Sequence, residues 1–301
     1  MSYSIFPARH SRSSTDARQL AFSQTGDANS PEVLVCLPGL LETRASFDPL
    51  LKAADRIDGL RVLAVDHCGR GDSDPLADDR GYRMSVYLHD LQEFLRQEVM
   101  RSGEPAPRIH LLGTSMGGIL AMYLAAEANN QIHGLAFNDI GLSLYWMSIY
   151  GLYDSMKQGG HLPPPDVLAR QLNVSLGVVH AVQTPTHFDL PFHKDWKGMR
   201  FAHLLKHFSG PLRLVHGTDS GVCLPDQVRE MRRLLPQTQI LEMPGASHPA
   251  PFNEAVCAFL LQHWLLGERE VAVEARASSG DASAHAGVWS WVKQHFSRYS
   301  G

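Results

Sequence analysis

The sequence has little cysteine. Its 301 residues include four, at Cys36, Cys68, Cys223 and Cys257, and no two of them form a CxxC pair. So few and such scattered cysteines exclude a disulfide-stapled fold and a cysteine-based zinc site. We therefore expect four reduced and mostly buried thiols, and we expect no metal.

Long apolar runs and an excess of charge of one sign are also missing. No segment is apolar over the length of a membrane span, and the first 20 residues hold no run typical of a signal peptide. The net charge is −4 with acidic and basic residues well mixed, so no basic face is available for nucleic acid or anionic lipid. We expect a cytoplasmic protein whose partner is a small molecule, without stable membrane insertion. Assembly into a homo-oligomer is left open.

What is present is a regular alternation of strand-like and helix-like segments. With 44% hydrophobic residues the chain can bury a large core. Strands flanked by helices predict an α/β fold with a mostly parallel central sheet covered on both faces. We expect strands within 32–40, 60–66, 108–113, 132–138, 211–217 and 239–243, and helices within 46–57, 85–99, 116–127, 225–235 and 253–266.

The alternation breaks between residues 141 and 206, where the sequence becomes rich in aromatic residues and then in glycine and proline. This interruption predicts a helical cap inserted into a core domain made of residues 1–140 and 207–266. Residues 267–301 contain few bulky side chains until a short amphipathic end. We expect them to form a flexible linker and a short tail.

The segment RIHLLGTSMGG passes from a strand pattern directly into a helix pattern. Gly113 and Gly117 stand two residues on either side of Ser115, the G-x-S-x-G spacing of a sharp turn that exposes a nucleophilic hydroxyl. The N–H of Met116 at the start of the helix is then a candidate donor to an oxyanion. In CLPGLL, we expect the N–H of Leu40 to be the second donor.

A serine nucleophile needs a base, and the base needs a carboxylate to orient it. His248 lies late in the chain in the loop MPGASHPAPF, after the last predicted strand. Asp219, in LVHGTDSGV at the end of the preceding strand, is the first choice for the acid. The chain order of serine, acid and histidine is that of the G-x-S-x-G hydrolases.

The motifs CLPGL, DHCGRGDSD, GTSMGG, NDIG, LVHGTDS and PGASHPAPF occur in an order that resembles the α/β-hydrolase superfamily, in particular bacterial hydrolases with a helical cap. The resemblance implies a cofactor-independent hydrolase that acts through Ser115, His248 and an aspartate. In the related group the usual aspartate position corresponds to Gly221. Asp139, in NDIG, is therefore kept as the alternative acid.

Aromatic and aliphatic residues at the start of the predicted cap, Leu142, Tyr145 and Trp146, are candidates for contact with an apolar or aromatic acyl substrate. Our first hypothesis is hydrolysis of a small carboxylic ester or lactone through an acyl-enzyme. A second is hydrolysis of a carbon–carbon bond or an enol-lactone in aromatic degradation with the same residues. A third is a binding protein on this fold that has lost catalysis.

Overall fold

The computed structural model describes residues 4–12, 18–78, 81–100, 106–127, 131–157, 163–183 and 197–264. The chain divides into two compact units, Met1–Leu261 and Gln262–Gly301, and the elements below belong to the first. The predicted linker and tail over 267–301 lie outside the described residues.

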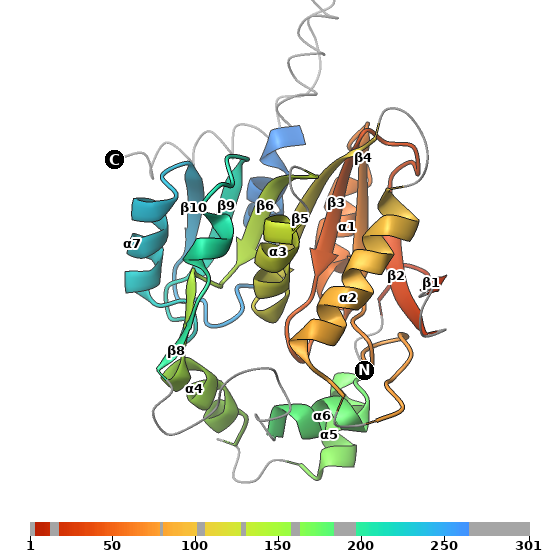
Figure 1. Ribbon diagram of the computed structural model, residues 1–301, viewed down its shortest axis with the longest axis vertical. Coiled ribbons are helices and arrows are strands. Elements are labelled where there is room, and N and C mark those ends of the chain that lie inside the picture. The colour runs from red at the N-terminus through yellow and green to blue at the C-terminus, as the bar shows by residue number, and fades with distance from the viewer. Residues whose placement is uncertain are drawn as a thin grey trace, which may run out of the picture. The chain divides into compact units, whose positions relative to one another are not determined.

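A single eight-stranded sheet forms the centre of the first unit (Figure 1). Every neighbouring pair from β4 to β10 is parallel, which confirms the predicted mostly parallel sheet. The first two strands pair antiparallel at one edge and were not predicted. In spatial order the strands are β1 (Arg9–Arg12), β2 (Gln19–Thr25), β4 (Leu60–Val65), β3 (Glu32–Leu37), β5 (Arg108–Thr114), β6 (Ile132–Asn138), β9 (Leu212–Gly217) and β10 (Thr238–Met243).

Helices cover both faces of this sheet. All six residues of β4 are buried, as expected for a strand with helices on both sides. Figure 1 shows α2 and α3 on the near face and α1 on the far face. The helices are α1 (Asp48–Ala54), α2 (Met84–Phe94) with a π-helical turn η2 (Leu95–Val99), α3 (Met116–Glu127) and α7 (Pro225–Leu234), and residues 254–261 are also helical.

No helix among the described residues combines the length and the apolar character needed to cross a membrane.

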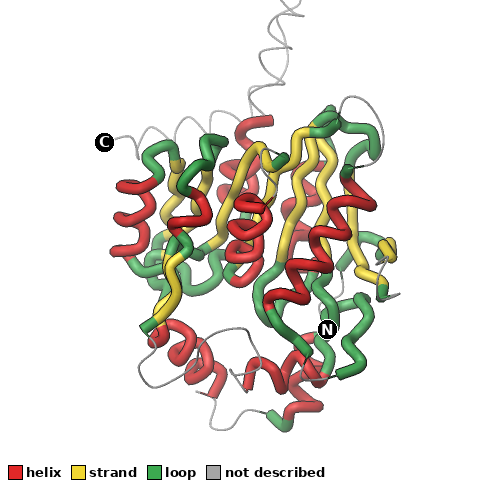
Figure 2. Tube along the Cα trace, viewed as in Figure 1, coloured by secondary structure: helices red, strands yellow, loops and turns green. Residues whose placement is uncertain are grey.

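The described residues between β6 and β9, here called the insert, leave the main sheet. They form a two-stranded antiparallel pair, β7 (Ser143–Tyr145) with β8 (Gly198–Arg200). The helices α4 (Trp146–Lys157), α5 (Pro165–Leu172) and α6 (Leu176–Gln183) lie beyond the carboxyl ends of the parallel strands (Figure 2). A 3₁₀ turn, η4 (Ala202–Leu205), leads back toward β9.

Main-chain hydrogen bonds join the insert to the loop after β4. The N–H of Gly71 donates to the carbonyl of Asn173 at 2.9 Å, and the N–H of Ser175 donates to the carbonyl of Gly69 at 2.6 Å. Between them, Arg70 and Val174 form an isolated β-bridge. The junction of α5 and α6 is thus attached to one loop of the core by its backbone.

A buried ion pair organises the same end of the sheet. Asp66, which follows β4, is fully buried and accepts hydrogen bonds from the backbone N–H and the guanidinium of Arg44. The Arg44 side chain also pairs with Asp72 and donates to the hydroxyl of Ser23 at 3.0 Å. Gly71 is required beside the pair, because a Cβ there would lie 2.1 Å from the Asp66 carboxylate. The pair therefore fixes the loops that follow β3 and β4.

Replacing Arg44 with methionine should cost about 3–5 kcal/mol of unfolding free energy, because it leaves a buried carboxylate unpaired. The matched control is Arg170→Met, which breaks an exposed pair with Asp166 on α5 and should cost about 1 kcal/mol or less. Urea denaturation of the two variants measures both values. Equal losses in the two would contradict the stabilising role of the buried pair.

Candidate active site

Ser115 occupies the sharp turn between β5 and α3. Its φ of 50° is left-handed, a conformation that costs energy for a residue with a side chain. A Cβ at Gly113 would lie 2.3 Å from the backbone of Gly117, and a Cβ at Gly117 would lie 2.1 Å from the carbonyl oxygen of Leu37. The two glycines of the motif are therefore needed for the close approach of α3 to the ends of β3 and β5.

The structure brings Ser115, His248 and Asp139 into one hydrogen-bonded row. The His248 Nε2 atom lies 2.9 Å from the Ser115 Oγ, and its Nδ1 atom lies 2.8 Å from an Asp139 carboxylate oxygen. Asp139 is fully buried, whereas the His248 side chain keeps 9% of its surface exposed. In this arrangement the carboxylate holds Nδ1 protonated and leaves Nε2 free to accept the serine proton.

Asp139 is held from several sides at the end of β6. Its φ is 59°, so it shares the left-handed conformation of Ser115. Its backbone N–H donates to the carbonyl of Val215 at 2.8 Å, and its second carboxylate oxygen accepts the N–H of Gly217 at 3.0 Å. Aspartate tolerates this backbone conformation better than most residues do. The geometry fixes the direction of the carboxylate toward His248.

The preference for Asp219 over Asp139 as the partner of His248 was wrong in geometry. Asp219 follows β9 by two residues, and its side chain is exposed and accepts a hydrogen bond from the Thr218 hydroxyl. Its backbone N–H donates to the carbonyl of Ala246, which ties the two loops together by main chain alone. The alternative residue, Asp139 of the NDIG motif, is the one that lies within hydrogen-bond distance of His248, and β6, which carries it, lies next to β9 in the sheet.

Asn138, which the sequence analysis did not single out, connects the three segments. Its carbonyl accepts the N–H of Ser115 at 3.1 Å. Its buried side-chain amide donates to the carbonyl of Ala250 at 2.9 Å, two residues after His248. It also directly precedes Asp139 in the chain. The sequence signal for this residue was its place at the start of the NDIG motif, at the end of a predicted strand.

The loop after β3, residues 38–42, is here called the oxyanion loop for the role predicted for Leu40, and it approaches the same place. The close contact of Gly117 with Leu37 brings this loop next to the first turn of α3, where Met116 lies. The carbonyl of Leu40 accepts a hydrogen bond from Arg70 Nε at 2.8 Å. The structure thus brings the loop of Leu40 and the helix start at Met116 together, as the sequence analysis expected of two oxyanion donors.

The predicted substrate contacts in the insert have different surroundings. Leu142 is fully buried and belongs to the hydrophobic core. The Tyr145 hydroxyl donates to Asp226 on α7 at 3.2 Å, and the half-buried Trp146 packs near Tyr150 with ring centroids 6.2 Å apart. Their contact with a substrate stays a prediction.

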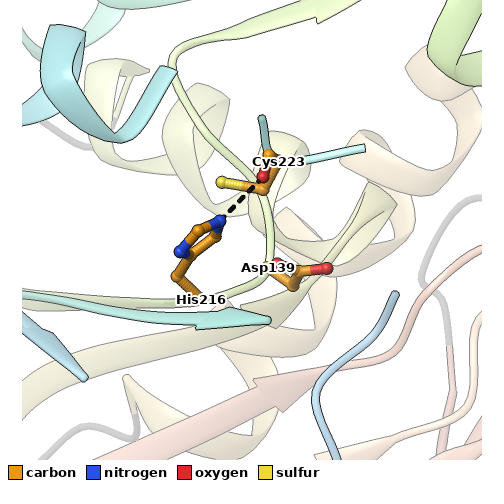
Figure 3. A group of neighbouring side chains, drawn as sticks. All are labelled: Asp139, His216 and Cys223. Carbon is orange, nitrogen blue, oxygen red and sulfur yellow. Dashed lines mark hydrogen bonds between the residues drawn. The ribbon is translucent and has the colours of Figure 1, made fainter. Parts of the chain in front are cut away.

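Behind the catalytic row, Asp139, His216 and Cys223 place one potential metal ligand each within 4.8 Å of one another (Figure 3). His216 Nε2 lies 3.0 Å from the Cys223 carbonyl, and both Asp139 oxygens already accept hydrogen bonds. Burial, and then the charges of Asp139 and Asp226, raise the pKa of the Cys223 thiol. A neutral thiol is a poor metal ligand, so this group fits a role in packing behind the carboxylate better than metal binding.

His67 contacts the backbone of the oxyanion loop. It is buried, and its Nε2 lies 3.1 Å from the carbonyl oxygen of Pro38. Burial first, and then the positive charge of Arg70, lower the pKa of His67 to about 3. The native protein therefore holds this ring neutral at pH values where the unfolded chain protonates it.

The His67 site should make the protein less stable in acid. Between about pH 6.5 and pH 3 the unfolded state binds one more proton than the native state at this residue, so stability falls by about 1.4 kcal/mol per pH unit as the pH is lowered. Glutamine can donate the same hydrogen bond without titrating. His67→Gln should therefore reduce the slope of the unfolding free energy against pH by about 1.4 kcal/mol per pH unit. Urea unfolding between pH 4 and 7 checks this. His207→Gln, at an exposed histidine, serves as the control, and identical slopes in all three proteins would refute the assignment.

Comparison with known proteins bears on the family to which the chain belongs. Residues 32–158 match the family described as alpha/beta hydrolase fold. The chain is 32% identical over 277 residues to the sn-1-specific diacylglycerol lipase ABHD11 of Mus musculus, covering 81% of this chain and 87% of that protein. It is 27% identical over 269 residues to the 3-hydroxybutyrate-oligomer hydrolase of Cupriavidus necator, covering 78% and 88%.

Among solved structures, an alpha/beta hydrolase from Novosphingobium aromaticivorans superposes with a TM-score of 0.66 at 22% identity, covering 87% of this chain and 98% of that one. A likeness at this identity reports the fold. The sequence relationship to the lipase, together with the family match and the shared fold, establishes that this chain belongs to the α/β-hydrolase family.

Proposed function

We propose that this protein is a serine hydrolase that cleaves a carboxylic ester or lactone through an acyl-enzyme. The observation that carries the proposal is the continuous row of hydrogen bonds from Ser115 Oγ through His248 to Asp139, at 2.9 and 2.8 Å. A serine hydroxyl becomes a nucleophile when an adjacent base takes its proton, and this row provides the base and its orienting acid.

In the acylation step, the Ser115 oxygen attacks the carbonyl carbon of the substrate and its proton moves to His248 Nε2. Asp139 stabilises the imidazolium that forms. The carbonyl oxygen becomes an oxyanion, to which the N–H groups of Leu40 and Met116 donate. When the tetrahedral intermediate collapses, His248 returns the proton to the leaving alcohol and Ser115 keeps the acyl group.

In the deacylation step, His248 takes a proton from a water molecule, whose oxygen attacks the acyl carbon. The second tetrahedral intermediate expels the Ser115 oxygen, which recovers its proton from His248. The carboxylic acid leaves and the enzyme returns to its starting state. Besides the substrate and this water molecule, the proposed steps use only side chains and backbone donors of this chain.

The names of the two sequence relatives bear on the substrate. One is a hydrolase of 3-hydroxybutyrate oligomers and the other a diacylglycerol lipase, and both names describe cleavage of esters of aliphatic acids. We infer an apolar acyl ester as the substrate class and the insert as a cap that selects it, with Leu142, Tyr145 and Trp146 as candidate contacts.

Hydrolysis of a carbon–carbon bond has less support. That reaction calls for cationic groups that hold an acidic substrate, and the candidates between β6 and β9 are Arg170, Lys194 and Arg200. Lys194 lies outside the described residues, which leaves Arg170 and Arg200. Both are exposed and already pair with carboxylates, Arg170 with Asp166 and Arg200 with Glu230. The reading as an inactive binding protein rested on a displaced acid, and Asp139 supplies that acid.

A fluorophosphonate probe tests whether Ser115 is activated. The wild-type protein should take up one equivalent of probe, and the Ser115→Ala variant should take up none, because the probe reacts with a serine only when a base and an oxyanion site assist it. Intact-protein mass spectrometry measures the stoichiometry. The exposed Ser209 provides the control variant Ser209→Ala, which should label fully. Labelling of Ser115→Ala at the wild-type rate would refute the proposed nucleophile.

The two aspartates are separated by a paired substitution. Asp139→Asn should lower kcat by about 10³- to 10⁴-fold, because the amide no longer stabilises the imidazolium and favours the wrong tautomer of His248. Asp219→Asn should stay within about threefold of wild type, since its side chain is exposed. Steady-state hydrolysis of p-nitrophenyl butyrate measures both. A larger loss in Asp219→Asn than in Asp139→Asn would reverse the assignment.

A further inference from the structure

One ionisable side chain near the catalytic row has no part in the mechanism above. Glu42 lies at the end of the oxyanion loop, and its carboxylate accepts the backbone N–H of Gly39 at 2.8 Å. In the return direction, the backbone N–H of Glu42 donates to the carbonyl of Gly39 at 3.3 Å. Glu42 therefore binds Gly39 through two hydrogen bonds, one to its side chain and one from its main chain.

These two hydrogen bonds act on the peptide group that contains the proposed oxyanion donor, the N–H of Leu40. The carbonyl of Gly39 and the N–H of Leu40 belong to the same peptide unit, and in a trans peptide they point in opposite directions. Holding the Gly39 carbonyl toward Glu42 turns the Leu40 N–H away from Glu42. Binding the Gly39 N–H to the carboxylate also occupies a neighbouring donor.

Other contacts hold the peptide groups on either side. His67 contacts the carbonyl of Pro38, and Arg70 donates to the carbonyl of Leu40. Gly39 lies between these two carbonyls, and both of its described hydrogen bonds are with Glu42. A Cβ at position 39 would lie 2.7 Å from the Glu42 carboxylate, so a side chain there would displace that carboxylate from its hydrogen bond.

We propose that Glu42 is a positioning residue that sets the orientation of the oxyanion loop, and with it the direction of the Leu40 N–H. The inference rests on the proposed serine-hydrolase function and deepens it. Glu42 acts through the peptide of Gly39 and Leu40 and touches no reacting atom. Its essential feature is an acceptor oxygen at the reach of a glutamate side chain.

The electrostatic setting agrees with this role. Burial raises the pKa of the Glu42 carboxyl, and the Gly39 N–H, the Ser46 hydroxyl and the nearby His248 each oppose that rise. A carboxyl retained in a partly desolvated position needs such partners to stay there. The hydrogen bond to Gly39 is the partner that acts on the catalytic loop.

Three substitutions at Glu42 separate the acceptor from the charge. Alanine removes both, aspartate keeps the charge but shortens the reach, and glutamine keeps the reach and an acceptor oxygen without the charge. We expect Glu42→Ala and Glu42→Asp to lower kcat for p-nitrophenyl butyrate by about 10- to 100-fold with KM changed less than about threefold, because a misdirected donor weakens binding of the transition state. Glu42→Gln should recover most of the lost kcat.

Hydrogen exchange at the Gly39 amide gives a readout that does not depend on turnover. It should accelerate in Glu42→Ala and Glu42→Asp and stay slow in Glu42→Gln. Thermal unfolding identifies any variant that has lost its fold, in which case the aspartate and glutamine variants decide the comparison. Glu242→Ala, which removes an exposed carboxylate on β10, is the control for kcat.

The outcomes distinguish the two proposals. Wild-type kcat in Glu42→Ala, or equal losses in Glu42→Gln and Glu42→Ala, would overturn the positioning role while Ser115 is still labelled by the fluorophosphonate. A wild-type protein that shows neither labelling nor ester hydrolysis would overturn the serine-hydrolase function and the role of Glu42 with it.

Discussion

The close approach of the first turn of α3 to the end of β3 is the constraint on which the rest of the site depends. It requires the absence of a Cβ at Gly113 and Gly117 and a left-handed backbone at Ser115. Such a conformation costs on the order of 1–3 kcal/mol and persists only where the surroundings enforce it. The buried strands β3 and β5 supply that enforcement. Because of it, the hydroxyl and the oxyanion loop meet at one point.

The carboxylate beside His248 lies where the ends of two neighbouring strands meet. Strands β6 and β9 are parallel neighbours, with Asn138 paired to Val215, so the residues just beyond their ends face the same region. In this chain the carboxylate that contacts His248 follows β6, and Gly217 at the end of β9 contributes the N–H that holds this carboxylate. One strand end thus carries the carboxylate, and its neighbour carries the backbone donor that holds the carboxylate in place.

The fold was largely predictable from the sequence, because the apolar runs of the parallel strands and the periodicity of the helices are local patterns. The antiparallel strands β1 and β2 were missed. β1, Arg9–Arg12, is a short edge strand that carries little apolar signal. Motif spacing and chain order predicted that Ser115 and His248 lie together, and the structure places them 2.9 Å apart. The preference for Asp219 failed because the choice between two aspartates depends on strand adjacency and side-chain direction. Glu42 and Asn138 were missed for a related reason, because their roles lie in hydrogen bonds to backbone atoms of the motifs, which a sequence pattern does not reveal.

The insert is attached to the loop after β4 through the backbone of residues 173–175. These three residues share backbone hydrogen bonds with the loop that carries Arg70, and Arg70 in turn holds the carbonyl of Leu40. Because these contacts are made by backbone atoms, substitutions of most other side chains in the insert should leave this attachment intact. Under the proposed function, the insert could therefore be changed to accept other acyl groups while the loop that carries Leu40 keeps its support.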